Sequence, residues 1–169
     1  MAVADVVGEI GPPITVVSLH AVWEGGGWAI RTIHRQISDL MYLFADRFRP
    51  RKAGPVSRMV VAGDFNITTQ LDPPWDQHAR ELFRRLELFG FTNPLLPSAE
   101  QRGRLPGCPC QDDPCPHFET WRRRPAPGKK PYQIDYLYLS PDLEVEGAAV
   151  GSLDHAYSDH APLVVDVRS

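Results

Sequence analysis

The sequence predicts a mixed α/β domain whose strands pair mostly in antiparallel fashion. β-branched runs at residues 3–7 and 14–19 flank a Gly-Pro-Pro segment, which is typical of a hairpin. Apolar residues then recur at helical spacing in two stretches, and three further short strands follow near the C-terminus. With 169 residues, of which 43% are hydrophobic and 23% charged, one such domain can bury a core without disulfide staples.

Between the hairpin and the middle of the chain, the pattern predicts one helix and one buried strand. Apolar spacing predicts a helix over residues 30–48 that ends before Pro50. Residues 59–62 form a short and wholly apolar run, as expected for a strand that is buried on both faces. This strand leads directly into Asp64.

The second half of the chain begins with a helix and ends with three strands. Asp72 is expected to cap the helix, with Pro73 at its first position and Gly90 at its end. Residues 93–118 are rich in Pro, Gly and Cys and predict an ordered but irregular loop insertion. No repeat or linker divides the chain, so residues 1–169 are expected to form a single domain. The strands that follow the loop are 133–139, 145–150 and 163–167.

Charge and composition disfavour some classes of protein. The net charge of −3 argues against a strongly basic nucleic-acid binder, but it leaves room for nucleic acid held locally by a divalent metal and a few arginines. No run is long and apolar enough for a membrane span, and the N-terminus lacks a signal-peptide pattern, so a cytoplasmic setting is expected. One dense basic stretch is either a solvated loop or a phosphate-steering patch; it comprises Arg122, Arg123, Arg124, Lys129 and Lys130.

Polar side chains with catalytic chemistry follow the ends of several predicted strands. Asp64 and Asn66 occupy alternate positions after the apolar strand, so they either face one site or form an Asx turn. His20 ends the strand over 14–19, where a lone histidine is more often structural than catalytic. Asp135 lies among residues that favour burial, and because an unpaired buried carboxylate is costly, it is expected to have a partner.

Two adjacent residues, Asp159 and His160, precede the last strand, and because adjacent side chains diverge, separate roles are expected for them. Together with the strand-end residues they offer what phosphodiester hydrolysis requires. Carboxylates can hold a hard cation such as Mg²⁺, which neutralises phosphoryl oxygens and lowers the pKa of bound water. A histidine oriented by an aspartate can donate a proton to the developing charge.

Four segments in order resemble the endonuclease/exonuclease/phosphatase family. They read Thr-Val-Val-Ser-Leu-His at 15–20, Val-Val-Ala-Gly-Asp-Phe-Asn at 60–66, Gln-Ile-Asp-Tyr-Leu-Tyr-Leu-Ser at 133–140 and Ser-Asp-His-Ala-Pro-Leu at 158–163. The resemblance runs from about Val3 to Val167. It implies a two-layer β-sandwich flanked by helices, and a metal-dependent hydrolase of phosphoric ester bonds.

The resemblance also implies ligands and a substrate. Asp64 and Asn66 would position the attacking water or contact the scissile phosphate, and Asp159 together with Asp64 would bind Mg²⁺ or Mn²⁺. The favoured substrate is a phosphodiester of nucleic acid, so the protein would be a nuclease. A phospholipid or inositol phosphate head group is the alternative.

Each histidine receives a separate role from the resemblance. His160 would stabilise or protonate the phosphoryl group, held in its tautomer by Asp135. His20 would lie near the leaving oxygen. In some members of the family, the aspartate at the Asp135 position supports this second histidine instead.

One departure from the family concerns the start of its domain. The family's domain begins with a strand bearing an asparagine, followed by a glutamate that binds metal, and neither precedes the first motif here. Glu9 lies at the expected hairpin turn and Glu24 beside a glycine-rich segment, so neither matches the family's glutamate. The chain is therefore expected to be the C-terminal part of the domain, with the N-terminal portion missing. It would be either an active enzyme or a catalytically incompetent remnant, split half or interaction module. Because an open sandwich exposes apolar strand faces, self-association is expected.

The three cysteines of the chain are concentrated in one short segment together with a histidine. Cys108, Cys110, Cys115 and His117 offer three thiolates and an imidazole, which satisfy a tetrahedral structural Zn²⁺. The alternatives are free thiols, or a disulfide that joins Cys115 to Cys108 or Cys110. Any zinc here would be separate from the catalytic metal.

Overall fold

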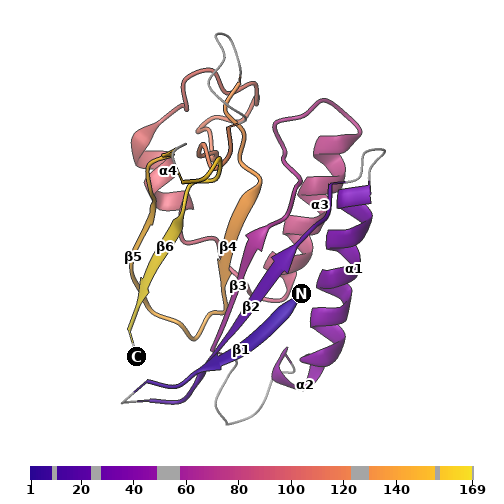
Figure 1. The fold of residues 1–169 in the computed structure, drawn as a ribbon, viewed down its shortest axis with the longest axis vertical. Coiled ribbons are helices and arrows are strands. Elements are labelled where there is room, and N and C mark those ends of the chain that lie inside the picture. The colour runs from indigo at the N-terminus through magenta and orange to yellow at the C-terminus, as the bar shows by residue number, and fades with distance from the viewer. Residues whose placement is uncertain (9–10, 24–27, 49–57, 123–129, 155–156, 169) are drawn as a thin grey trace.

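The computed structural model describes residues 1–8, 11–23, 28–48, 58–122, 130–154 and 157–168. The helices and strands follow one another in the order (Figure 1) β1 Ala2–Val6, β2 Ile14–His20, α1 Trp28–Leu43, α2 Ala45–Phe48, β3 Met59–Asp64, α3 Trp75–Leu88, α4 Leu96–Arg102, β4 Asp135–Leu139, β5 Val145–Val150 and β6 Leu163–Val167. Among these helices none is long and apolar enough to cross a bilayer.

The strands form two sheets. One has the order β1-β2-β3-β4, and the other is the pair β5-β6. β2 and β3 run parallel, whereas β1–β2, β3–β4 and β5–β6 are antiparallel. The predicted hairpin and the predominance of antiparallel pairing are therefore confirmed.

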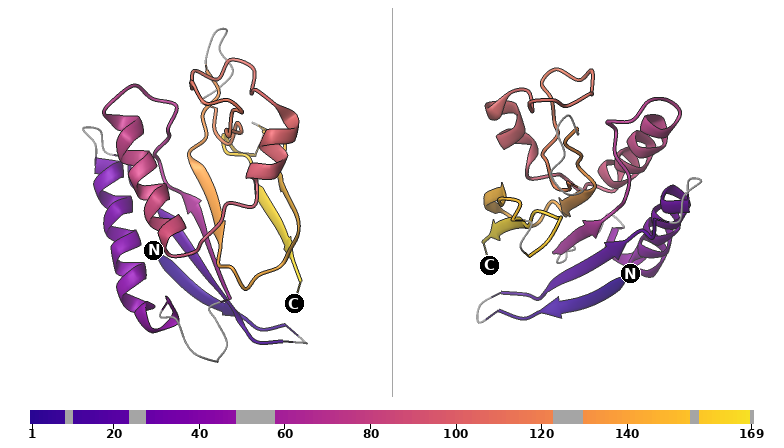
Figure 2. Two further views of the ribbon diagram at one scale, coloured as in Figure 1. Left: turned by 180° about the vertical axis from the view of Figure 1, so that it is seen from behind. Right: turned by 45° about the horizontal axis from the view of Figure 1, so that its top comes forward.

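Alternation along the strands divides their apolar side chains between two faces of the larger sheet. Val17 and Val61 belong to a buried cluster that includes the apolar faces of α1 and α3. Val60 and Leu139 belong to a second cluster, which residues of β6 pack against. Because successive side chains of a strand point to opposite faces, the helices cover one face and the β5–β6 sheet covers part of the other (Figure 2). The predicted sandwich with flanking helices is confirmed.

Helix spacing explains how α1 and α3 attach to the sheet. Ile33, Ile37 and Leu40 of α1 are fully buried, and so are Leu82 and Leu86 of α3. These positions recur every three or four residues, which places them on one side of each helix. The single helix predicted over 30–48 is instead two helices, because α1 ends at Leu43 and α2 begins at Ala45.

The start of α3 differs from the prediction by two residues. The Asp72 carbonyl accepts a hydrogen bond from the Trp75 backbone N–H at 3.2 Å, so Asp72 begins a turn that precedes the helix and is not its cap. The cap position is Pro74, with no side-chain cap bond. A residue before proline is disfavoured in helical conformation, so Pro73 lies outside the helix and α3 begins after the second proline.

The prediction of irregular structure throughout 93–118 is wrong for its first part, which contains α4. Pro97 lies in the first turn of this helix, and Gly103 ends it with a φ of 76°. Proline near a helix start and glycine just past its end are the usual signals, and both were present in the sequence. The Cys-containing remainder, residues 103–118, has no helix or strand.

Strand β4 begins at Asp135, two residues later than predicted. The backbone N–H of Gln133 donates to the Gln70 side chain at 2.7 Å. The backbone N–H groups of Ile134 and Asp135 both donate to Thr120 Oγ1, at 3.0 and 3.1 Å. The side chains of Gln70 and Thr120 therefore take the place of a strand partner just before β4.

Candidate functional site

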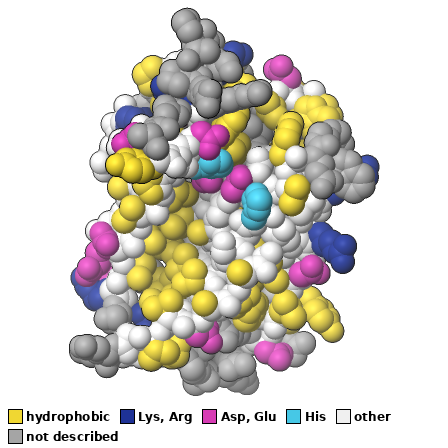
Figure 3. Space-filling view, viewed as in Figure 1, with side chains coloured by type: hydrophobic (Ala, Val, Ile, Leu, Met, Phe, Trp, Pro, Cys, Tyr) yellow, Lys and Arg dark blue, Asp and Glu magenta, His cyan; other side chains and the backbone are white. Residues whose placement is uncertain are grey.

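Three polar side chains form a row across the end of the four-stranded sheet. His20 pairs in register with Asp64 across β2 and β3, and Asp64 pairs with Asp135 across β3 and β4. All three alternate with residues that face the helices, so they point to the opposite face, the one shared with β5 and β6. Figure 3 shows histidine side chains next to acidic ones in the upper middle of this face.

Asp64 and Asn66 form an Asx turn, and this turn also places their two side chains next to each other. Asp64 Oδ1 accepts the backbone N–H of Asn66 at 2.9 Å, and the Asn66 amide donates to Asp64 Oδ2 and to the Ala21 carbonyl at 2.7 Å each. Asn66 has a φ of 49°, so it lies outside the strand. A turn, and not strand alternation, therefore brings the two side chains to one site.

His160 supplies the partner that the burial of Asp135 requires. His160 Nδ1 lies 3.1 and 3.0 Å from the two carboxylate oxygens of Asp135, whose side chain is 13% exposed. A carboxylate accepts, so the proton lies on Nδ1 and Nε2 carries the lone pair in the neutral ring. Asp135 thus pairs with His160 and not with His20.

His20 stands closer to Asp64 than to any other carboxylate described. Its Nε2 is 3.8 Å from Asp64 Oδ2, and its side chain is 68% exposed. The main chain of His20 is held on both sides by Gln36 of α1, which accepts from its N–H and donates to its carbonyl. The histidine backbone is therefore fixed while its ring faces solvent.

Thr120, Trp121 and Gln36 support the site, and nothing in the sequence pattern identified them. Fully buried Thr120 accepts from the backbone at the start of β4, and its carbonyl accepts the Ala161 N–H at 2.7 Å. Trp121 Nε1 donates to Asp159 Oδ2 at 3.1 Å. The segment around 120 thereby connects Asp135 to the segment carrying Asp159 and His160.

Burial raises the pKa of both Asp64 and Asp135. Loss of solvent is the largest cause in each case, and hydrogen bonds from Asn66 and from His160, respectively, oppose it. The hydrogen bonds therefore do not fully offset the cost of burying each carboxylate's negative charge. A cation or a protonated histidine at this point would stabilise the ionised form.

The acidic side chains of the row do not form a ready cage for a metal. Among the described residues, the cysteine cluster is the group in which three or more Cys, His, Asp or Glu ligand atoms converge. Mg²⁺ requires fewer protein ligands, since it usually keeps several waters and binds one or two carboxylates together with substrate phosphate.

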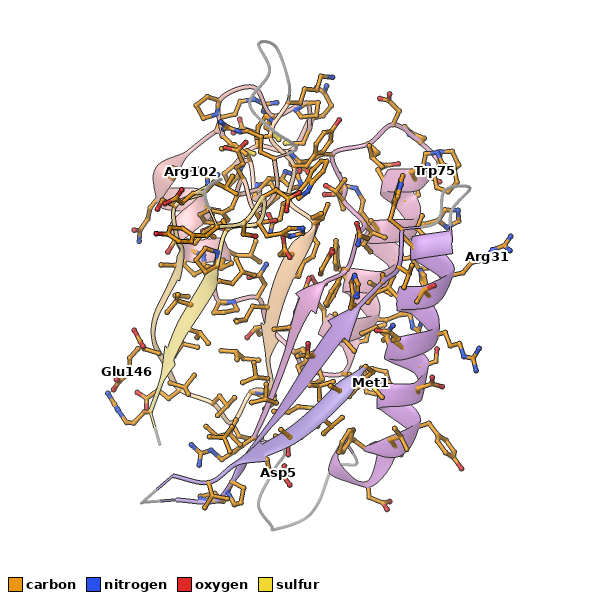
Figure 4. All side chains as sticks on the ribbon, in the orientation of Figure 1. Met1, Asp5, Arg31, Trp75, Arg102 and Glu146 are labelled. Atoms are coloured by element: carbon orange, nitrogen blue, oxygen red, sulfur yellow. The ribbon has the colours of Figure 1, made fainter. Side chains whose placement is uncertain are left out.

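An apolar pocket adjoins the row. It has a volume of about 240 Å³ and is lined by Asn66, by apolar residues of the following loop, and by Trp23 and Trp75. The two indoles are 69% and 42% exposed. Figure 4 shows Trp75 at the N-terminal end of α3. A larger cavity of about 460 Å³, lined by Phe83 and Tyr138, lies on the helix side of the sheet, away from the row.

Cys108, Cys110, Cys115 and His117 come together in the structure. All four are buried, and their ligand atoms lie within 4.8 Å of one another. The three cysteines are free. Burial lowers the pKa of His117 to about 4, so its ring is neutral near pH 7. The cluster is compatible with a metal site.

Some residues considered from the sequence lie outside the described part of the chain. Of the basic stretch, Arg123, Arg124 and Lys129 belong to this group, as do Glu9 and Glu24. Arg122 is described, and its guanidinium pairs with the carboxylate of Glu119.

Comparison with known proteins relates the whole described site to one family. The model of the Endonuclease/Exonuclease/phosphatase family matches residues 6–160, whereas no curated protein matches in sequence. An endonuclease/exonuclease/phosphatase structure from Beutenbergia cavernae is 20% identical, with a TM-score of 0.62, over 98% of this chain and 38% of its own. At that identity the likeness shows a shared fold.

Two further structures are more distant. The mannosyl-6-phosphatase of Bacteroides thetaiotaomicron is 14% identical with a TM-score of 0.47, over 93% of this chain and 52% of its own. The human Nocturnin catalytic domain is 20% identical with a TM-score of 0.49, over 92% of this chain and 46% of its own. The chain thus spans between 38% and 52% of the length of these three structures.

Proposed function

Because the chain belongs to the endonuclease/exonuclease/phosphatase family, we propose that it hydrolyses phosphoric ester bonds with a divalent metal, as a nuclease or related phosphodiesterase. The observation that carries this proposal is the partly buried Asp135–His160 pair, in the same row as Asp64 and His20. An oriented imidazole beside a carboxylate that can bind a cation is the arrangement that phosphoryl chemistry requires.

Asp64 and Asp159 would hold Mg²⁺ or Mn²⁺ in this proposal. The ion would neutralise charge on the phosphoryl oxygens and lower the pKa of bound water. The two Asn66 hydrogen bonds orient the Asp64 carboxylate, and the Trp121 indole orients that of Asp159. The sulfur-rich cluster suits Zn²⁺ instead, since thiolates favour that ion over Mg²⁺.

The histidines would act on opposite sides of the phosphoryl group. With Nδ1 of His160 engaged by Asp135, its Nε2 is the atom left for the substrate, and it donates to a phosphoryl oxygen when the ring carries both protons. His20, exposed and next to Asp64, would donate a proton to the leaving oxygen.

The pocket beside Asn66 favours nucleic acid over the other phosphoric esters. Exposed Trp23 and Trp75 offer flat apolar surfaces in a pocket that is also lined by Asn66, the hydrogen-bond partner of Asp64. Stacking of a base on an indole is worth about 1–3 kcal/mol and tolerates any sequence.

Metal dependence tests the proposed activity. We expect hydrolysis of plasmid DNA and of bis-p-nitrophenyl phosphate with Mg²⁺ or Mn²⁺, and its loss in EDTA. Asp64→Asn should remove the activity while the circular dichroism spectrum is kept, because it weakens cation binding. Hydrolysis that persists in EDTA would contradict the metal mechanism. Absence of turnover with either ion would favour a catalytically incompetent domain.

Trp75→Ala tests the preference for nucleic acid. We expect KM for an oligonucleotide to rise by about 5- to 100-fold, because a stacking surface is lost. Hydrolysis of bis-p-nitrophenyl phosphate, which is too small to depend on the pocket, should change little. Tyr157→Ala is the matched control, because this aromatic side chain is 90% exposed and does not line the pocket. Equal losses on both substrates would contradict a role in base binding.

A further inference from the structure

The spacing of the ligand atoms in the cysteine cluster matches tetrahedral coordination of zinc. Cys110 Sγ and Cys115 Sγ are 3.5 Å apart, and His117 Nδ1 lies 3.6 Å from Cys108 Sγ and 3.8 Å from Cys115 Sγ. With Zn–S bonds of about 2.3 Å and a Zn–N bond of about 2.0 Å, the edges of a tetrahedron are about 3.5 to 3.8 Å. A disulfide requires about 2.05 Å between sulfurs. The atoms are therefore placed as ligands and not as a bonded pair.

The chemistry around the cluster also fits a bound cation. Three thiolates with one Zn²⁺ leave one negative charge, which is costly to bury without a counter-charge. Arg104 supplies it, and its guanidinium donates to the carbonyls of Cys108, Cys110 and Asp112. The same contacts wrap the loop around the four ligands.

His117 is held in the orientation that a metal ligand needs. Its Nε2 lies 2.6 Å from Thr69 Oγ1. If Nε2 carries the proton and donates to Thr69, Nδ1 has its lone pair directed at the sulfurs. A hydrogen bond to the second ring nitrogen is the usual way in which proteins fix a metal-binding histidine.

Gln70 connects the cluster to the catalytic row. Its amide nitrogen donates to Cys108 Sγ at 3.2 Å and to the Pro131 carbonyl at 2.9 Å. Its amide oxygen accepts the backbone N–H of Gln133 at 2.7 Å. Gln70 is 5% exposed, so these bonds do not compete with water.

The two segments that Gln70 joins are those that carry the catalytic carboxylates. Thr69 and Gln70 follow Asn66 by three and four residues, and Gln133 precedes Asp135 by two. Gln133 also accepts the Phe118 N–H, which comes directly after His117 in the chain. The cluster is thus attached to both sides of the site.

We infer that Cys108, Cys110, Cys115 and His117 bind a structural Zn²⁺ that fixes the segments 64–70 and 131–135 relative to each other. Thr69 and Gln70 are the positioning residues that transmit this constraint. The four ligands are different residues from Asp64 and Asp159, which are proposed for the hydrolytic metal. The zinc part of the inference does not depend on the proposed hydrolysis, since it is measured without turnover.

Zinc content tests the site. Reduced protein purified without chelator should contain one Zn²⁺ per chain by elemental analysis, and Co²⁺ in its place should give the absorption of tetrahedral thiolate coordination. Cys115→Ser and His117→Asn should lose the ion, whereas His78→Asn, an exposed histidine on α3, should keep it. Zinc at background level, a disulfide among the cysteines, or full zinc content in both ligand variants would overturn the site.

Amide hydrogen exchange tests the positioning role in the unmodified protein. On removal of zinc, protection should fall in 64–70 and in 131–135 as well as in the cysteine loop. Thr69→Val should weaken zinc binding by about 10- to 100-fold, the usual effect of losing such a partner. Thr92→Val, at an exposed position after α3, should leave it unchanged. Loss of protection confined to 103–118 would overturn the inferred link.

Discussion

Replacing His160 with alanine should lower kcat for the proposed phosphodiester hydrolysis by about 10²- to 10⁴-fold, the usual contribution of a positioned acid or base. The ring is anchored through Nδ1 to Asp135, so the direction of its second nitrogen is fixed. The substitution removes that nitrogen and leaves the carboxylate without its partner. Single-turnover kinetics at saturating substrate measure the loss, and His78→Ala is the matched control on an exposed histidine.

Asp135→Asn should cost almost as much as the loss of His160, although the side chain keeps its size. An amide can donate to Nδ1 and so favour the tautomer with the proton on Nε2, which reverses the donor and acceptor of the ring. Because the two residues act as one unit, the double variant should be no slower than His160→Ala alone. Asp39→Asn, at an exposed position of α1, controls for the loss of a negative charge. Additive losses, or an unchanged rate in His160→Ala, would contradict the assigned pair.

The strands of this fold were predictable because their patterns are short-range. The β-branched residues in 14–20, the wholly apolar run before Asp64 and the large side chains in 135–139 are all local signals of strands. The start of α3 was not predicted correctly, because a capping aspartate and a helix-starting proline were considered without the second proline. The start of β4 depended on Gln70 and Thr120, which are distant in sequence and carry no periodic signal.

The candidate site, too, was predictable only in part from the sequence. Burial alone predicted that Asp135 has a partner, and the structure supplies it from 25 residues away. The side chains that orient the site could not be found from the sequence, because a glutamine on α1 and a threonine in a loop are ordinary surface residues by composition. Gln36 and Thr120 act through main-chain hydrogen bonds that exist only once the sheet, α1 and the loop have assembled.

Gly63 is the residue whose replacement should destabilise the fold most. Its φ is 140°, which L side chains rarely adopt, and a Cβ there would lie 1.9 Å from the Leu19 carbonyl oxygen of the neighbouring strand. The unfavourable backbone alone costs about 1–3 kcal/mol. The overlap is with main chain and cannot be relieved by a rotamer change. We therefore expect Gly63→Ala to lower the free energy of unfolding by roughly 4 kcal/mol or more, a large share of the stability of a small domain.

Two further glycines separate the causes of that loss in urea unfolding experiments. Gly103 has a φ of 76° but nothing within 4 Å of an added Cβ, so Gly103→Ala should cost only the backbone strain of about 1–3 kcal/mol. Gly147 has an ordinary contact of 3.5 Å, so Gly147→Ala should be neutral or gain up to about 1 kcal/mol. The excess loss in Gly63→Ala then measures the close approach of β2 and β3, which brings His20 beside Asp64. A loss no larger than that of Gly103→Ala would mean that the strands can separate without penalty, and the row would not be rigidly held.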